Sequence, residues 1–219
     1  MNAHVTGLSA REFTSVSRTE AFILSHSFDR PTLVIDREAV ARQYSALAQG
    51  LGRARIHYAV KANPEAEILR TLVGLGSNFD AASRAEIEMC LAAGASADRI
   101  SFGNTVKRVS DIAWAHAAGI GIFAADAEAE LEKLAAHAPG CEVYIRIVVE
   151  SCEADWPLSR KFGCARDKAL DLMAYAKRLD LKPVGLSFHV GSQTKRAAMW
   201  RPVLEQVAAV WHAAQDAGH

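Results

Sequence analysis

The sequence lacks the features that mark membrane or nucleic-acid-binding proteins. Its 219 residues carry 25 lysines and arginines against 25 aspartates and glutamates, so no net charge favours nucleic acid or an acidic membrane. No apolar run reaches the roughly 18 residues that a membrane span needs, and residues 1–28 lack the apolar stretch of a signal peptide. These absences predict a cytoplasmic protein with no nucleic-acid or membrane partner.

Cysteine is scarce and is not spaced for metal binding. The four cysteines include no C-x-x-C pair: Cys90, Cys141, Cys152 and Cys164. We therefore expect reduced thiols, as in a cytosolic protein, and no metal site.

What is present is a strict alternation of strand and helix patterns in a chain that is 50% hydrophobic and 23% charged. The pattern predicts strands at 56–60, 77–80, 100–102, 120–123, 143–149 and 184–190. It predicts helices between and after them at 64–75, 84–93, 106–118, 127–137, 167–179 and 197–217. Before these, we expect a short helix at 18–25, a strand at 31–35 and a helix from Asp36 to about residue 49.

This alternation predicts the fold class α/β, with a parallel sheet covered by helices. Six βα units without a dinucleotide glycine fingerprint favour a (β/α)8-type barrel over a doubly wound sheet. A closed barrel of this type has eight units, so the sequence predicts an incomplete barrel over 31–219, behind an irregular segment 1–30.

Residues at the helix ends support these boundaries. Asn63 is placed to cap a helix with Pro64 in its first turn, and Gly94 and Gly119 follow helix ends, where a left-handed residue is common. Glu86 lies in a Ser-Arg-Ala-Glu capping box at 83–86, in which it would bond back to the amide of residue 83.

Strand periodicity places several charged side chains in one barrel interior. Alternation puts Lys61, Arg146 and His189 on the face opposite the apolar one, and Asp80 opposite Phe79. A lone buried cation is costly unless it is paired, so these charges imply an anionic or covalently bound partner. Lys61 follows an apolar strand at the barrel end that carries active sites, where an amine can hold a carbonyl cofactor as a Schiff base.

Six segments then resemble one family in order. The chain from 31 to 219 is similar to the fold-type III pyridoxal phosphate (PLP)-dependent decarboxylases, the ornithine, diaminopimelate and arginine decarboxylase group. The segments are YAVKANP at 58–64, NFDAASRAEIE at 78–88, ISFGNTVK at 100–107, IRI at 145–147, WPLSRKFG at 156–163 and SFHVGSQ at 187–193. The fifth, with the acidic residue before it, looks closest to bacterial ornithine or lysine/ornithine decarboxylases.

The resemblance implies a PLP-binding barrel of the alanine racemase/ornithine decarboxylase type and gives its residues roles. Lys61 matches the lysine that carries PLP, and His189 matches the histidine stacked on the cofactor ring, so both are expected to be catalytic. The cofactor-binding residues would be Lys61, Asp80, Glu86, Arg146, His189 and Ser192. Lys161 matches a lysine that meets the partner subunit. Simpler interpretations stay open: an ion pair of Arg146 with Glu142 or Asp80, a turn residue for Asp80, a helix cap for Glu86, a loop hydroxyl for Ser192 and a surface charge for Lys161.

The implied activity is decarboxylation of a basic amino acid, with L-ornithine giving putrescine in polyamine biosynthesis as the first expectation. Lysine, arginine and diaminopimelate are alternative substrates, and a homodimer is expected for the full-length form. The family's glycine-rich phosphate loop and C-terminal β-domain are not found before His219. We therefore expect 1–219 to be the N-terminal part of a longer enzyme or a truncated form. A non-catalytic PLP-binding protein or a regulatory homologue is the alternative.

Overall fold

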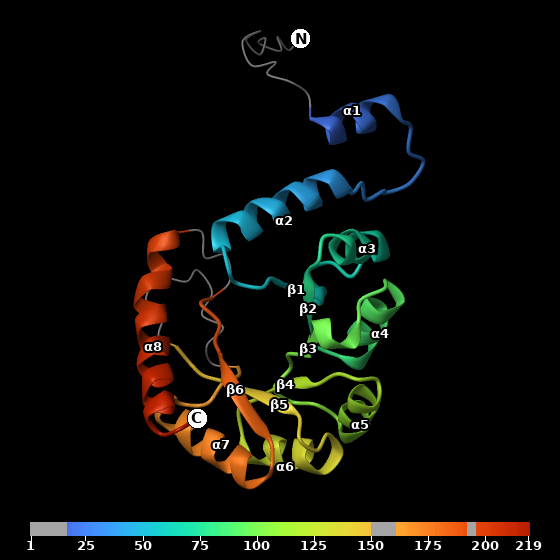
Figure 1. Cartoon of the computed structure of the whole chain (residues 1–219). Coiled ribbons are helices and arrows are strands. Elements are labelled where there is room, and N and C mark those ends of the chain that lie inside the picture. Colours follow the sequence, from blue (N-terminus) through green and yellow to red (C-terminus); the bar gives the residue numbers. More distant parts are fainter. Residues whose placement is uncertain (1–16, 150–160, 192–195) are drawn as a thin grey trace, which may run out of the picture.

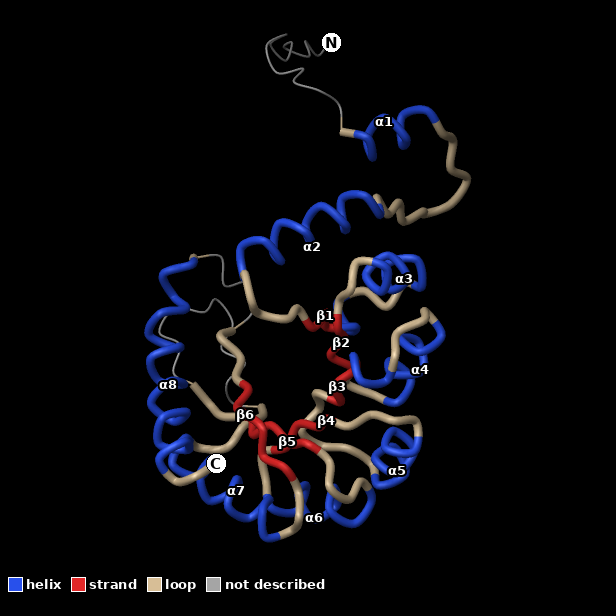
Figure 2. The backbone as a smooth tube through the Cα atoms, in the orientation of Figure 1, coloured by secondary structure: helices blue, strands red, loops and turns tan. Residues whose placement is uncertain are grey.

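The computed structural model describes residues 17–149, 161–191 and 196–219. Its sheet has six parallel strands in chain order: β1 (His57–Ala59), β2 (Asn78–Ala81), β3 (Ile100–Phe102), β4 (Ile122–Ala125), β5 (Glu142–Arg146) and β6 (Lys182–Ser187). Figure 2 shows the strands as an arc inside a ring of helices, with β1 and β6 as its edges. The expected incomplete α/β barrel is confirmed.

Helices cover the outer face of this arc (Figure 1). They are α2 (Arg37–Leu51), α3 (Ala66–Gly74), α4 (Arg84–Ala92), α5 (Val109–Ala117), α6 (Glu128–His137), α7 (Arg166–Arg178) and α8 (Trp200–Asp216). The strand residues beneath them are almost fully buried, among them Phe79, Phe102, Phe123, Val143 and Ile145. The core therefore lies between the sheet and the helices rather than inside the barrel. Burial of one such side chain contributes about 1.5–3 kcal/mol to stability.

The N-terminal part differs from the expectation in one element. The short helix α1 (Arg18–Ser25) is confirmed, and it lies apart from the barrel in Figure 1. The expected strand at 31–35 is wrong, because this stretch has no neighbouring strand to pair with among the described residues. It leads instead to Asp36, whose carboxylate accepts the backbone N–H groups of Glu38 and Ala39 at 2.9 and 3.1 Å and so caps α2.

The turn that carries Lys61 also differs. Residues Val60–Ala62 form a one-turn 3-10 helix, η1, rather than the end of a strand, and α3 begins at Ala66. Asn63 is therefore not the residue next to the helix, although its side chain accepts the N–H of Glu65 at 3.1 Å and orders the approach to α3. The left-handed residues after α4 and α5 are confirmed at Gly94 and Gly119, with φ of 98° and 91°.

The described thiols are free, and no described helix is long and apolar enough to cross a membrane. Burial raises the pKa of Cys90 to about 12 and the pKa values of Cys141 and Cys164 to about 11. These thiols are therefore protonated at neutral pH, which makes them poor nucleophiles. Cys152 lies outside the described residues.

Candidate functional site

The inner face of the sheet carries the polar side chains. The strand register aligns Ala59 with Asp80, Asp80 with Ser101, and Arg146 with Ser187. Because aligned residues of neighbouring strands share a face, these side chains point away from the apolar core. The predicted interior face is thus confirmed for Asp80 and Arg146, which lie in the paired strands.

Four of the predicted site residues lie near one another at the carboxyl ends of the strands. Lys61 lies just after β1, close enough for its charge to act on both Asp80 and His189. Arg146, at the end of β5, also acts on His189. Lys61 is exposed while the other three are half-buried, so the burial argument made from sequence applies to Arg146 and not to Lys61. The arrangement offers an accessible amine beside a carboxylate, an imidazole and a guanidinium.

The imidazole of His189 is held in one orientation. Its Nδ1 accepts the N–H of Gly191 at 2.9 Å, and Gly191 has a φ of 105°, a conformation that favours glycine. An accepting Nδ1 places the proton of the neutral ring on Nε2. Burial, followed by the charges of Arg146 and Lys61, lowers the pKa of His189. A neutral, oriented ring results, which suits contact with a flat ligand.

We predict that His189 titrates below the value of about 6.5 that an unperturbed histidine shows. Its contribution to stability is fully present above that pH and is lost as the pH falls through the folded-state pKa. Replacing Arg146 by methionine should raise the midpoint, because a like charge is removed. NMR titration of the His189 ring measures the midpoint in the wild type and in the Arg146→Met variant. Arg178→Met, which removes a guanidinium over the surface ring of Tyr175, is the control. A wild-type midpoint above 6.5 would contradict the arrangement.

Asp80 is anchored by residues that the sequence analysis did not single out. Ser101 Oγ donates to Asp80 Oδ1 at 3.0 Å, and the Tyr144 side chain lies close enough to interact with both of these side chains. Burial raises the pKa of Asp80, and these interactions and the charge of Lys61 oppose that rise. Strand alternation does place Tyr144 on the interior face. It does not predict that Tyr144 approaches Asp80, because this depends on how the strands are staggered relative to one another.

The guanidinium of Arg146 has an aromatic contact instead of an ion pair among the described residues. Its Cζ lies 5.4 Å from the ring centroid of Phe162. Two hydrogen bonds hold the chain directly after Phe162. The N–H of Cys164 donates to the Arg146 carbonyl at 2.9 Å, and the N–H of Gly163 donates to the Asp126 carboxylate at 2.8 Å. The segment 161–164 therefore borders the cluster.

Gly163 is the residue on which that attachment depends. It has a φ of 106°, and a Cβ there would lie 2.9 Å from the backbone carbon of Ile147. We predict that Gly163→Ala destabilises the protein by about 1–3 kcal/mol. Gly50→Ala, in α2 with nothing within 4 Å of its Cβ position, is the control and should stabilise slightly. Urea unfolding compares the two, and equal effects would show that Gly163 is not constrained.

The remaining predicted residues are not brought into the cluster by any described contact. Glu86 Oε2 accepts the N–H of Ala82 at 2.7 Å, and its own N–H donates to Ser83 Oγ at 3.3 Å. It thus caps α4 in a variant of the expected box, in which the bond returns to Ala82 rather than Ser83. Lys161 is exposed, and Ser192 lies outside the described residues. Their roles toward a cofactor or a partner subunit stay predictions.

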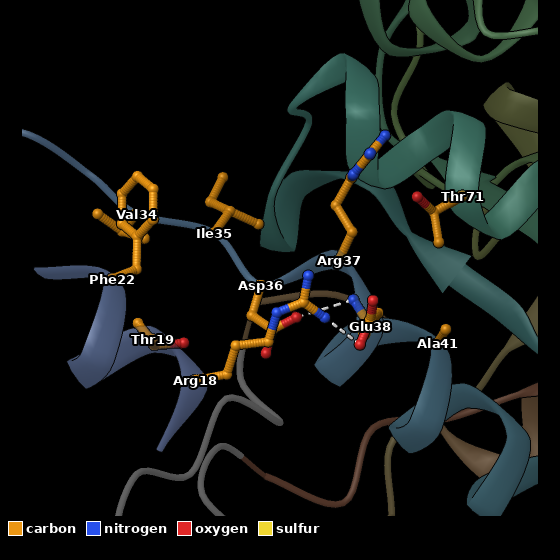
Figure 3. A pocket seen from close by; sticks show the side chains of 10 residues that line it. All are labelled: Arg18, Thr19, Phe22, Val34, Ile35, Asp36, Arg37, Glu38, Ala41 and Thr71. Carbon is orange, nitrogen blue, oxygen red and sulfur yellow. Dashed lines mark hydrogen bonds and ion pairs between the residues drawn. The ribbon is translucent and has the colours of Figure 1, made fainter. Parts of the chain in front are cut away.

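A separate cavity of about 400 Å³ lies between α1 and the start of α2. Figure 3 shows that Arg18 pairs with Glu38 across it, while Asp36 points to the backbone of α2. Its acidic and basic side chains balance, and none of its lining residues belongs to the cluster around Lys61. We therefore place the functional site at the strand ends and not in this cavity.

The chain is similar to known proteins over most of its length. Residues 37–219 match the family model "Pyridoxal-dependent decarboxylase, pyridoxal binding domain". A lysine/ornithine decarboxylase of Selenomonas ruminantium is 34% identical over 203 residues, which are 93% of this chain and 52% of that protein. The crystal structure of a lysine/ornithine decarboxylase from Vibrio vulnificus, complexed with putrescine, superposes with a TM-score of 0.82 at 31% identity, covering 93% of this chain and 55% of that one.

A third relative is not named as a decarboxylase. Antizyme inhibitor 2 of Xenopus laevis is 30% identical over 197 residues, which are 90% of this chain and 43% of that protein. The chain thus spans about half the length of the relatives it matches.

Proposed function

Because this chain belongs to the pyridoxal-dependent decarboxylases through their pyridoxal-binding domain, we propose that it is the cofactor-binding part of an L-ornithine decarboxylase that produces putrescine. The observation that carries the proposal is the accessible amine of Lys61 beside Asp80, His189 and Arg146 at the carboxyl ends of the strands. Relatives named for ornithine or for lysine and ornithine support the choice of substrate.

The residues present fit pyridoxal phosphate. The cofactor has an aldehyde, a flat ring and a phosphate, and the interior offers an amine at Lys61, an oriented imidazole at His189 and a guanidinium at Arg146. Small residues on the same face leave space for a ring, since Ala59 and Gly185 align with Asp80 and Tyr144. Exposure of Lys61 leaves its amine open to reaction.

We assign the following tasks to the chain's own residues. Lys61 Nζ would hold the cofactor covalently through its aldehyde carbon, and once released by a substrate amine it would be placed to return a proton. His189 presents its ring face, because the Gly191 amide fixes its orientation. Arg146 attracts an anionic group, and Asp80 balances positive charge at Lys61. The bound cofactor supplies an electron-accepting ring as the carboxylate leaves.

Carbon dioxide release tests the proposed substrate. The complete enzyme of which this chain is proposed to be the cofactor-binding part is purified, supplied with pyridoxal phosphate, and given carboxyl-labelled L-ornithine, L-lysine, L-arginine or meso-diaminopimelate. We expect release to be fastest from ornithine. Faster release from another of the four would replace the substrate and leave the cofactor site intact, whereas release from none would contradict a decarboxylase.

The second candidate is a non-catalytic homologue that binds the cofactor or regulates a full-length enzyme by pairing with it. The similarity to an antizyme inhibitor favours it. Retention of Lys61 with its three polar neighbours is the observation against it. This candidate predicts cofactor capture without carbon dioxide release, together with co-purification with a longer homologue.

A further inference from the structure

Asp80 is held more firmly than a strand-end aspartate requires. Its neighbour in the next strand, Ser101, is 4% exposed and donates to Oδ1 at 3.0 Å. Directly after that strand, Gly103 leaves no room for a side chain, since a Cβ there would lie 1.9 Å from Asp80 Oδ1. The carboxylate therefore packs directly on the backbone of Gly103, and the Ser101 hydroxyl fixes its direction.

Tyr144 lies near the same carboxylate but comes from another part of the sheet. It is on β5, three strands from β2, and it is close enough to Asp80 and Ser101 to interact with both side chains. Burial raises the pKa of Tyr144 far above its ordinary value, so the phenol keeps its proton at neutral pH and has one proton to donate. The Ser101 hydroxyl thus binds the Asp80 carboxylate, and the Tyr144 hydroxyl is a second donor in its neighbourhood.

The charges around this group show what a fixed carboxylate can do. Lys61 and His57 face Asp80, and Arg146 faces Tyr144. The charge of Lys61 thus acts on Asp80, and in general a carboxylate held in a constant position favours the charged form of a nitrogen close to it. Without its donors, burial would favour the neutral acid, which offers Lys61 no charge.

We propose that Ser101 and Tyr144 are positioning residues, whose hydroxyls hold Asp80 ionised and directed at Lys61 so that positive charge on the lysine nitrogen is stabilised. The effect on Asp80 depends only on residues of this chain and requires no cofactor. The part concerning the lysine–cofactor imine rests on the proposed function.

NMR titration of the Asp80 carboxyl in the cofactor-free protein tests the first part. Ser101→Ala should raise the Asp80 midpoint by about one pH unit, because the hydrogen bond of 3.0 Å to the carboxylate is lost. Tyr144→Phe should shift it in the same direction by a smaller amount and serves if Ser101→Ala does not fold. Tyr175→Phe, which removes a hydroxyl bonded to the surface carboxylate of Glu132 at 2.7 Å, should leave it unchanged. An Asp80 midpoint that either site variant leaves unchanged or lowers overturns the inference.

The second part is read from the visible spectrum after pyridoxal phosphate is added. A protonated lysine imine absorbs at longer wavelength than a neutral one, so the ratio of the two bands against pH gives the midpoint of the imine. We expect Tyr144→Phe and Ser101→Ala to lower this midpoint by about half to one pH unit, and Tyr175→Phe to leave it in place. No imine band in the wild type would contradict the proposed function while the Asp80 titration still decides the positioning role. A band whose midpoint neither site variant moves would refute the link to Lys61.

Discussion

Replacing Lys61 by methionine is expected to abolish the visible band that forms when pyridoxal phosphate is added to the protein. No other lysine is placed beside Asp80, His189 and Arg146 in the described part of the chain, so no other amine can hold the aldehyde against these neighbours. Lys61→Arg should lose the band equally, because guanidinium keeps the charge but forms no stable imine at neutral pH. Together these two variants distinguish covalent capture of the cofactor from its electrostatic attraction.

Lys182→Met, which removes an exposed lysine at the start of β6, is the control and should retain the band. Circular dichroism of all three variants shows whether the fold is kept. A band of undiminished intensity in Lys61→Met would mean that the cofactor is held elsewhere.

Lys107→Met is expected to have the largest effect on stability, with a loss of about 3–5 kcal/mol. The Lys107 side chain is 0% exposed, and its Nζ lies 2.8 Å from Glu130 Oε1. It also donates to the carbonyls of Asn104 and Ala124 at 2.9 and 2.6 Å, and thereby joins the loop after β3 to the end of β4. Its removal leaves two carbonyls without this donor and leaves the 5% exposed Glu130 with Lys133 alone.

This loss is measured as a decrease in the urea concentration at the unfolding midpoint, with an unchanged slope of the unfolding free energy against urea. Lys168→Met breaks an ion pair with Asp171 in which both side chains are 65% exposed, and should cost less than about 1 kcal/mol. Adding Glu130→Leu to Lys107→Met should restore part of the loss, because the carboxylate left with Lys133 alone is removed. A Lys107→Met variant as stable as Lys168→Met would show that the buried pair is not required.

The fold could be predicted largely because strand and helix periods differ. Alternation alone placed Arg146 and Asp80 on the face opposite Phe79 and Val143, and the register confirms this assignment. Boundaries were less predictable, because local bonds decide them. The sheet was expected to continue to 149, but β5 ends at Arg146, beyond which the N–H of Val148 donates to Cys164.

The site was predictable where a residue's strand position sufficed and not where several strands combine. Lys61 and His189 each lie two residues after a strand, so the strand pattern was enough to predict the end of the sheet to which they belong, although the strand expected at 184–190 ends earlier, at Ser187. The approach of Tyr144 to Asp80 brings together residues from strands that are not neighbours, and no local sequence pattern predicts it. The pairing of Lys107 with Glu130 likewise joins a loop to a helix 23 residues later, and depends on how α6 packs.

The central claim is that Lys61 is the amine that takes the cofactor. Treating the protein with pyridoxal phosphate, reducing it with borohydride and mapping the label by mass spectrometry of peptides tests this claim most directly. The account predicts that the label is on Lys61 at stoichiometric yield and near background on exposed lysines such as Lys168 and Lys182. Labelling spread over the exposed lysines, with Lys61 no more modified than the others, would contradict it.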